Sequence, residues 1–226
     1  MEEIIVPNIL VSITAPPKTG KTHLAMTFPA PLKIYSFDLG AKFVKTKFPE
    51  KQIEIVEYAL PILESDSPAP WAEKIWLDFL KDYKHDAYSG EYSTLVIDTA
   101  TALWGICRQA ITEEKNRKRL TEVEYALPNL KMSAIFAHAK TAGVNLVTIQ
   151  YNRDRYVKQE NTGEKELDGW KQTEGQVDVV LDMSRVITSS KCSMLTKIVD
   201  NRFDRNVNGK VLTDTNYDEI YTLLGI

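Results

Sequence analysis

The sequence predicts an α/β fold in which helices flank a mainly parallel central sheet. Short apolar runs rich in β-branched residues alternate along the chain with segments of helical periodicity, which is typical of parallel sheets. The chain has 226 residues, of which 43% are hydrophobic. That length buries one core and leaves little room for a second large domain. We therefore expect one domain over residues 1–226.

The elements of the first hundred residues follow from apolar runs and from the residues that end them. Pro29 and Pro31 end the first helix. Three prolines mark an exposed loop over 61–70, and residues 71–83 place apolar side chains on one helical face. In chain order, we expect a strand at 8–14 (NILVSIT), a helix at 21–28, strands at 32–37 and 52–56, a helix at 71–83 and a strand at 94–98 (TLVID).

The second half of the chain continues this alternation. Gly143 is a suitable C-cap for the helix before it, and the strand that follows it (VNLVTIQ) ends at Gln150. In chain order, we expect helices at 101–118 and 129–142, strands at 144–150, 177–187 and 194–199, and a closing helix at 217–224.

Charge and cysteine content narrow the class of protein. The net charge is -3, so a nucleic-acid partner would have to be held by a local basic patch. Cys107 and Cys192 lie far apart and fit neither a disulfide framework nor a zinc site, and we expect two reduced core thiols. His23, His85 and His138 show no metal-ligand spacing, so we expect them to be structural or exposed.

The ends and apolar runs of the chain indicate its environment. The longest apolar runs are far shorter than the ~20 residues that a membrane span needs. The N-terminus, Met1-Glu2-Glu3, is acidic where a secretory signal is positive. We expect a soluble, cytoplasmic protein without a membrane partner.

A phosphate-binding motif lies between the first strand and the first helix. Residues 15–22 read Ala-Pro-Pro-Lys-Thr-Gly-Lys-Thr, which matches the Walker A pattern G-x-x-x-x-G-K-[ST] except that Ala15 replaces the first glycine. Backbone N–H groups and the helix N-terminus make an anion site in such a loop. We expect Lys21 to face solvent and phosphate, and the Thr22 hydroxyl to bind Mg²⁺. The expected ATP contacts are Pro17, Lys18, Thr19, Gly20, Lys21, Thr22 and His23.

A carboxylate for the same metal ion ends a later strand. Asp98 follows Leu95-Val96-Ile97 and would hold Mg²⁺ through water, as a Walker B aspartate does. The alternative is an aspartate that only caps the helix starting near Thr101. With the P-loop motif present, the metal role is the preferred interpretation.

Two positions argue against particular P-loop families. The residue after Asp98 is Thr99, where AAA+ and ABC-type enzymes usually have a catalytic glutamate. Partition-type ATPases carry a lysine directly after the first P-loop glycine, and that position here is Pro16. Both observations weigh against these families.

The order of motifs resembles the RecA-like ATPase core. A strand ends in Asp98-Thr99, a long helix follows, and a later strand ends in Gln150. More narrowly, the chain looks like the short RecA-like ATPases of phages, which include single-strand annealing proteins. The supporting features are Thr-Phe-Pro at 27–29, Phe-Asp-Leu-Gly at 37–40 and Asp-Val-Val at 178–180. The resemblance covers roughly residues 9–205 and implies a RecA-like P-loop NTPase core.

The resemblance also implies catalytic roles. Gln150 would sense the γ-phosphate and pass the signal into a following DNA-binding loop. RecA has a catalytic glutamate two residues beyond the aspartate that ends its second strand. Here that aspartate is Asp38, and Gly40 occupies the glutamate position. Either Asp38 orients the attacking water or it is a solvated strand-end residue. In the second case, hydrolysis is slow or its base lies elsewhere.

Two basic segments occupy the positions of the DNA-binding loops of RecA-like proteins. After Gln150, the cations would neutralise phosphates and a tyrosine would stack on a base; the alternative is a β-hairpin with a solvated charged face. The second segment could equally be the charged end of a helix, where cations complement the dipole. The candidate residues are Arg153, Arg155, Tyr156 and Lys158 in the first segment and Lys115, Arg117, Lys118 and Arg119 in the second.

Two late cations complete the predicted site. Lys197 and Arg202 lie where RecA-like subunits reach into a neighbour's nucleotide, so they are candidate fingers acting in trans, or else surface charges. We therefore expect a homo-oligomer, as a ring or a filament. The predicted function is a DNA-stimulated ATPase acting on single-stranded DNA in recombination, annealing or replication, with a single-strand-binding protein as a further candidate partner. A P-loop small-molecule kinase and a nucleotide-gated assembly module remain alternatives.

Overall fold

The computed structural model describes residues 8–61, 70–117, 119–157, 160–189 and 191–226. Its elements alternate between strands and helices over most of the chain, as expected. In chain order they are β1 (Leu10–Ala15), α1 (Lys21–Ala25), β2 (Leu32–Ser36), α2 (Ala41–Lys45), β3 (Ile53–Glu57), α3 (Ala72–Ser89), β4 (Thr94–Asp98), α4 (Ala100–Glu114), the 3₁₀ turn η1 (Val123–Tyr125), α5 (Ala126–Ala142), β5 (Asn145–Val157), β6 (Glu160–Asp168), α6 (Thr173–Gln176), β7 (Val179–Ile187), β8 (Cys192–Asn201), the 3₁₀ turn η2 (Arg205–Val207), β9 (Val211–Thr213) and α7 (Tyr217–Leu224).

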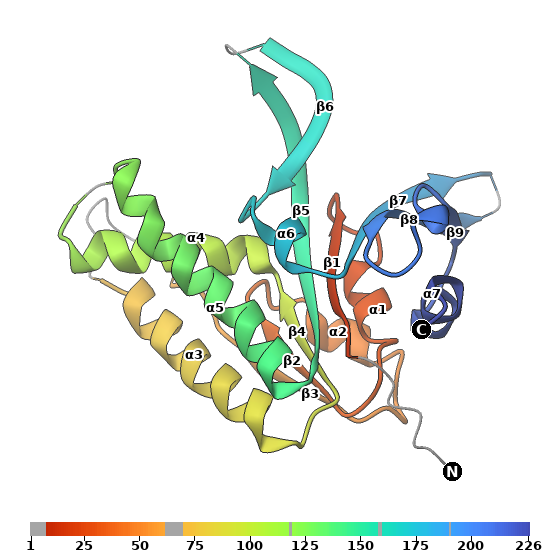
Figure 1. Ribbon diagram of the computed structural model, residues 1–226, viewed down its shortest axis with the longest axis horizontal. Coiled ribbons are helices and arrows are strands. Elements are labelled where there is room, and N and C mark those ends of the chain that lie inside the picture. Colours follow the sequence, from red (N-terminus) through yellow and green to blue (C-terminus); the bar gives the residue numbers. More distant parts are fainter. Residues whose placement is uncertain (1–7, 62–69, 118, 158–159, 190) are drawn as a thin grey trace.

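The strands of the described ranges form a nine-stranded sheet in the order β3-β2-β4-β5-β1-β7-β8-β9, with β6 paired to β5. The pairings from β3 to β7 are parallel, whereas β6, β8 and β9 are antiparallel to their neighbours. The predicted α/β fold with a mainly parallel sheet flanked by helices is confirmed. The β5–β6 hairpin projects beyond the sheet (Figure 1).

Each face of the sheet is covered by its own set of helices. Apolar side chains of α3, α4 and α5 pack against one face, together with Leu95 and Leu146. Side chains of α1 and α7 pack against the other face, together with Val96 and Val147. Neighbouring strand residues thus point to opposite cores, as the pleat requires. Because both faces are buried, the central strands are continuous apolar runs rather than alternating ones.

The segments that the sequence did not predict are short or polar. Helix α2 has five residues and strand β9 has three, too short for a periodicity to show. Strand β6 carries polar and charged side chains, and the first six of its nine residues are exposed. Strand β5 runs on to Val157 instead of ending at Gln150, because β6 pairs with its extension. Most of the loop predicted at 61–70 lies outside the described residues.

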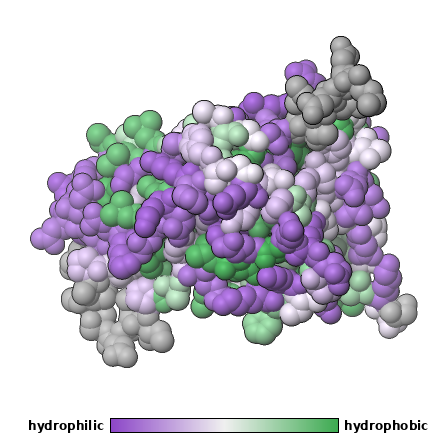
Figure 2. All heavy atoms as spheres, turned by 90° about the horizontal axis from the view of Figure 1, so that it is seen from below, coloured by the Kyte–Doolittle hydropathy of each residue, from purple (hydrophilic) through white to green (hydrophobic). Residues whose placement is uncertain are grey.

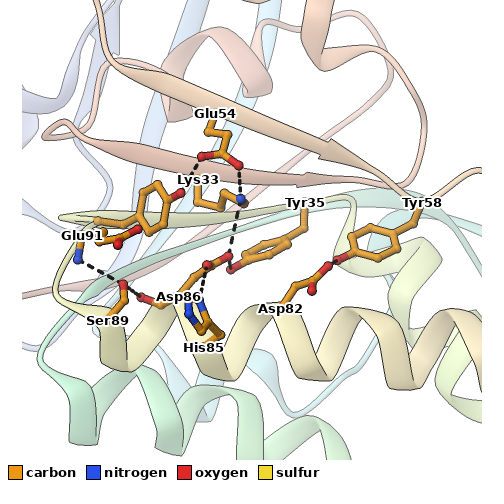
Figure 3. Close-up of polar contacts among 10 residues, drawn as sticks. Lys33, Tyr35, Glu54, Tyr58, Asp82, His85, Asp86, Ser89 and Glu91 are labelled. Carbon is orange, nitrogen blue, oxygen red and sulfur yellow. Dashed lines mark hydrogen bonds and ion pairs between the residues drawn. The ribbon is translucent and has the colours of Figure 1, made fainter.

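A polar network joins the last turns of α3 to the edge of the sheet (Figure 3). Asp86, which is 6% exposed, accepts a hydrogen bond of 2.9 Å from the Tyr35 hydroxyl. The Lys33 ammonium lies 3.7 Å from the same carboxylate and also pairs with Glu54 of β3. Burial, with Asp86 beside it, raises the pKa of Tyr35 far above its usual value. The buried Tyr35 and Asp86 satisfy each other, and their hydrogen bond connects α3 to β2.

The surface and the cysteines add two findings. Hydrophilic side chains cover most of the face away from the hairpin, with apolar ones in a few patches (Figure 2). Within the described ranges, no helix is both long and apolar enough to cross a membrane. Both cysteines are free thiols; Cys107 is buried, but Cys192 is exposed. The expectation of two core thiols is therefore wrong for Cys192, which is the first residue of β8.

Candidate nucleotide-binding site

The predicted phosphate loop joins β1 to α1 at the carboxyl end of the parallel strands. Ala15 is the last residue of β1 and pairs with Tyr151 of β5 in the ladder. It has the extended backbone that any residue adopts, which explains why alanine replaces the first Walker A glycine. Gly20 is the N-cap of α1 with φ 83°, a left-handed conformation that favours glycine. Lys18 also has positive φ, at 62°, an uncommon value that often marks ligand sites.

Lys21 is buried rather than facing solvent, which corrects the prediction from the sequence. Lys21 is only 6% exposed. Its ammonium donates to the carbonyls of Ala15 at 3.0 Å and Pro16 at 2.8 Å. Burial lowers the Lys21 pKa to about 8, although Asp98 and Asp38 oppose this change. A partly desolvated cation that neutral carbonyls hold in place is a strong attractor for phosphate oxygens.

The remaining residues of the loop differ in accessibility. Pro17 and Lys18 are exposed, and Thr19 is buried with its hydroxyl donating 2.8 Å to the Pro16 carbonyl. The exposed His23 ring packs against Phe48, with centroids 4.8 Å apart. Among the described residues, no group of three or more His, Cys, Asp or Glu side chains could hold a metal ion on its own. None of the three histidines belongs to such a group within the described residues.

Thr22 and Asp98 lie together, although they are 76 residues apart. The Thr22 hydroxyl donates to Asp98 Oδ2 at 2.8 Å. Asp98 is 1% exposed, and burial, helped by the nearby Asp38, raises its pKa to about 7. A hydroxyl and a carboxylate are the hard oxygen ligands that suit Mg²⁺, which completes its shell with phosphate oxygens and water. These two residues therefore fit the predicted metal.

The alternative role for Asp98 does not survive the structure. Thr99, not Asp98, caps α4, because its side-chain oxygen accepts a hydrogen bond of 3.2 Å from the Ala102 N–H. The Asp98 carboxylate points to the P-loop helix instead. Asp98 is thus free to serve the phosphate site.

Asp38 lies on the exposed rim of the same site. One of its carboxylate oxygens accepts from the Gly40 N–H at 3.0 Å and the other from the Tyr151 hydroxyl at 3.3 Å. Its charge acts on both Lys21 and Asp98. Gly40, in the position of the RecA glutamate, is the N-cap of α2 and brings no side chain to the site.

Gln150 is placed differently from the expectation. Strand β5 continues beyond it, and its side chain is fully buried on the face of the sheet opposite α1. The amide donates to the Ser12 hydroxyl at 3.2 Å. Its Oε1 has no hydrogen-bond partner among the described residues, and a Cβ on Gly169 would lie 2.5 Å from it. The Gly169 backbone therefore covers the amide.

Tyr151, the next residue, is the one that reaches the P-loop. Its ring centre lies 4.4 Å from the Lys21 ammonium. Burial, with Asp38 and Asp98 nearby, raises the Tyr151 pKa to about 12, so the hydroxyl stays protonated and donates. The sequence analysis did not predict this role for Tyr151. The signal in the sequence was that Tyr151 directly follows Gln150 in the strand and therefore points to the opposite face of the sheet.

The basic segment after Gln150 is a β-hairpin, the alternative that the sequence left open. Arg153 pairs with Glu166 at 2.9 Å and Arg155 with Glu164 at 2.6 Å, across the two strands. The positive charges of Arg153 and Arg155 are therefore compensated within the hairpin. Lys158 and the side chain of Tyr156 lie outside the described residues.

The second basic segment is also partly compensated. Lys115, the C-cap of α4, and Arg117 both contact one carboxylate oxygen of Glu124, at 3.0 Å and 2.8 Å. Arg119 is exposed, and Lys118 lies outside the described residues.

The two candidate fingers lie near the far strands of the sheet. Arg202 donates to the Gly175 carbonyl at 3.1 Å and lies 3.6 Å from Asp178 within its own chain. Lys197 is exposed on β8 and lines a small cavity with Asp182. Among the described residues, neither side chain has a hydrogen bond or an ion pair with the P-loop of its own chain.

Comparison with known proteins identifies the family of the chain. A family model described as an AAA domain matches residues 8–219. No curated protein matches the chain. Thr99, which argued against AAA+ enzymes in the sequence, thus does not separate the chain from a family of this description. The match spans the β1–α1 loop, Thr22 and Asp98 together, and the chain belongs to the AAA domain family of P-loop ATPases.

Proposed function

We propose that this chain is a Mg²⁺-dependent, RecA-like ATPase that acts on single-stranded DNA in phage recombination, annealing or replication. The observation that carries the ATPase part is the 2.8 Å contact between the Thr22 hydroxyl and Asp98 Oδ2 beside the buried Lys21 ammonium. A hydroxyl, a carboxylate and a lysine at the end of a P-loop are the groups that hold a metal-bound triphosphate. When bound, Mg²⁺ neutralises charge that develops on the phosphates.

The protein's own groups divide the work. Lys21 would exchange its contacts with two carbonyls for contacts with phosphate oxygens, which attract its charge more strongly. Asp98 would be ionised by the metal in spite of its burial, since a bound cation reverses the effect that raises its pKa. Asp38 is an exposed carboxylate whose charge acts on Lys21, and it is the candidate to orient the attacking water.

The hairpin is the candidate DNA contact. It projects beyond the carboxyl edge of the sheet (Figure 1), and β5 connects it directly to Tyr151 beside Lys21. Phosphates would have to compete with Glu164 and Glu166 for Arg155 and Arg153. We therefore expect DNA binding to be strongly salt-dependent and to become tighter when Arg153 and Arg155 separate from these carboxylates.

The active form is proposed to be a homo-oligomer, as a ring or a filament, in the cytoplasm. Arg202 or Lys197 would act in trans, and Arg202 would have to leave Asp178 and Gly175 to do so. Mixing Arg202→Ala subunits with Lys21→Ala subunits should then restore part of the activity. Turnover that does not depend on protein concentration would contradict this. A single-strand-binding protein is a further candidate partner.

The decisive test is ATP hydrolysis with and without single-stranded DNA, with Lys21→Ala as the inactive control and double-stranded DNA as the ligand control. We expect turnover that requires Mg²⁺ and rises with single-stranded DNA. A P-loop kinase would ignore DNA and transfer phosphate to a small molecule. An assembly module, which the missing glutamate at Gly40 favours, would bind ATP without turnover. Either result would contradict the proposal.

A further inference from the structure

A cavity of about 410 Å³ lies at the base of the hairpin, on the α4 and α5 side of the sheet. This volume is within the range of sites for small ligands and single nucleotides. The side chains that matter for its chemistry are Trp104, Arg108, Tyr125, Asn129, Arg153 and Lys171. We call it the Trp104 cavity.

One wall of the Trp104 cavity is aromatic. Trp104 of α4 is half-buried, and its ring lies 6.3 Å from that of Tyr125. The guanidinium carbon of Arg108 lies 5.2 Å from the Trp104 ring centre. An accessible indole with a guanidinium over it offers a flat apolar surface beside a cation. Such a pair suits a flat, anionic ligand.

The same cavity contains one cation, Arg108, that no described carboxylate neutralises. Arg108 makes no ion pair within the described ranges, and its buried Nε has no hydrogen-bond partner there. Arg153 and Lys171 share the Glu166 carboxylate. Asp168 is the one carboxylate among the described lining residues. Arg108 is thus available to an incoming phosphate.

The Trp104 cavity is also connected to the nucleotide site. Thr101 lines it from the first turn of α4, just after Asp98. The Thr101 hydroxyl donates to the Asp168 carbonyl at 2.5 Å and accepts from the Tyr151 N–H at 3.0 Å. A ligand that shifts residues 168–171 would therefore act on Tyr151, whose ring contacts Lys21.

We propose that the Trp104 cavity takes one unpaired nucleotide of a single DNA strand. The base stacks on Trp104, and Arg108 with Lys171 holds the adjoining phosphate. The proposal rests on the proposed action on single-stranded DNA and names the residues that receive it. Base stacking on an aromatic side chain tolerates every base, so the cavity contributes affinity without sequence preference.

The test measures binding of a labelled oligothymidylate and of an abasic oligomer of equal length, both with Mg²⁺ and a non-hydrolysable ATP analogue. Trp104→Ala should weaken oligothymidylate binding by about tenfold, on the order of 1.4 kcal/mol, and leave abasic binding unchanged. Trp104→Phe, which keeps a ring, should stay within about twofold of the wild type. Arg108→Ala should weaken binding of both oligomers and reduce its salt dependence. Arg185→Ala, at an exposed site on β7, is the matched control and should change nothing.

Two results would overturn the inference in distinguishable ways. If the wild type binds oligothymidylate, Arg155→Ala weakens it, and Trp104→Ala and Arg108→Ala do not, the Trp104 cavity is not the site and the proposed function stands. If the wild type binds neither oligomer with ATP analogue present, the proposed function fails, and the cavity assignment fails with it. Thermal unfolding of each variant shows whether it is folded, and if Trp104→Ala does not fold, the loss of binding in Arg108→Ala decides the matter.

Discussion

The Lys21 ammonium lies 4.4 Å from the centre of the Tyr151 ring, and the Tyr151 hydroxyl donates to Asp38 at 3.3 Å. One side chain therefore touches both the P-loop lysine and the carboxylate on the rim of the site. Tyr151 belongs to β5, whose extension is the projecting hairpin. If Lys21 turns towards phosphate, its contact with the Tyr151 ring changes. Because Tyr151 lies at the base of the hairpin, the position of the hairpin can change with it.

The first prediction follows from this contact. Tyr151→Ala should leave ATP and DNA each able to bind but should remove most of their mutual enhancement, which for such coupling is typically ~1–3 kcal/mol. Tyr151→Phe keeps the ring over Lys21 and should retain more of it. The measurement is the affinity for single-stranded DNA with and without an ATP analogue. Gln150→Ala is the comparison, because a larger loss there would return the sensor role to Gln150.

The second prediction concerns Lys21. Lys21→Ala and Lys21→Met should both abolish ATP binding and turnover. Either change removes a desolvated charge but leaves the carbonyls of Ala15 and Pro16 without their donor. These effects oppose each other, so we expect little change in the thermal midpoint. Full turnover in either variant would refute the P-loop assignment, and isothermal titration with ATP provides the measurement.

The third prediction concerns the buried Asp98. Its pKa rises from 3.8 in a free carboxyl to about 7 in the fold, so the folded state binds more protons in this interval. The corresponding stability is present below about pH 4 and is lost as pH rises to about 7. The amide side chain introduced by Asp98→Asn cannot ionise. Without Mg²⁺, the thermal midpoint of the variant should therefore rise relative to that of the wild type as the pH increases from 5 to 8. Its Mg²⁺-dependent turnover should be lost.

The control for Asp98→Asn is the same pair of melts with Mg²⁺ and an ATP analogue present. The wild type should then regain the difference, because only an ionised carboxylate serves the metal. An equal offset between the two proteins at pH 5 and pH 8 would show that Asp98 does not titrate in this range.

The fourth prediction concerns Asp86 and α3. Asp86→Ala should reduce the free energy of unfolding by about 1–3 kcal/mol, because the Tyr35 hydroxyl loses its buried acceptor. Asp82→Ala is the matched control, since Asp82 is less buried while it accepts from the Tyr58 hydroxyl, and its effect should be smaller. Denaturant unfolding measures both. Turnover per folded molecule should not change, and a loss of turnover in folded Asp86→Ala would place this network in the mechanism.

The fifth prediction concerns the second basic segment. Glu124 accepts from Lys115 and Arg117, and the hydrogen bonds and cations around it lower its pKa to about 2. Glu124→Gln would release both cations. If this segment contacts DNA, the variant should bind single-stranded DNA more tightly at low salt and show a steeper salt dependence. Identical binding curves across a salt series would remove the segment from the DNA interface.

The sequence by itself determined the fold class and the phosphate chemistry. Each βα unit is local, so apolar runs and helix stops show the parallel sheet. The P-loop is a continuous motif, and Asp98 ends an apolar strand, so both are visible before any strand is paired.

Only the tertiary structure decided how those groups meet and what surrounds them. Whether Gln150 or Tyr151 faces Lys21 depends on the register between β1 and β5, which joins Thr14 to Gln150 and Ala15 to Tyr151. From the sequence, the hairpin was only one of two interpretations of this segment, because its polar strands are held by cross-strand ion pairs and not by a buried face. The Trp104 cavity brings α4, η1, β5 and the segment after β6 together. Contacts between residues so distant in sequence follow from the packing of helices on a paired sheet, and no local pattern of residue types encodes them.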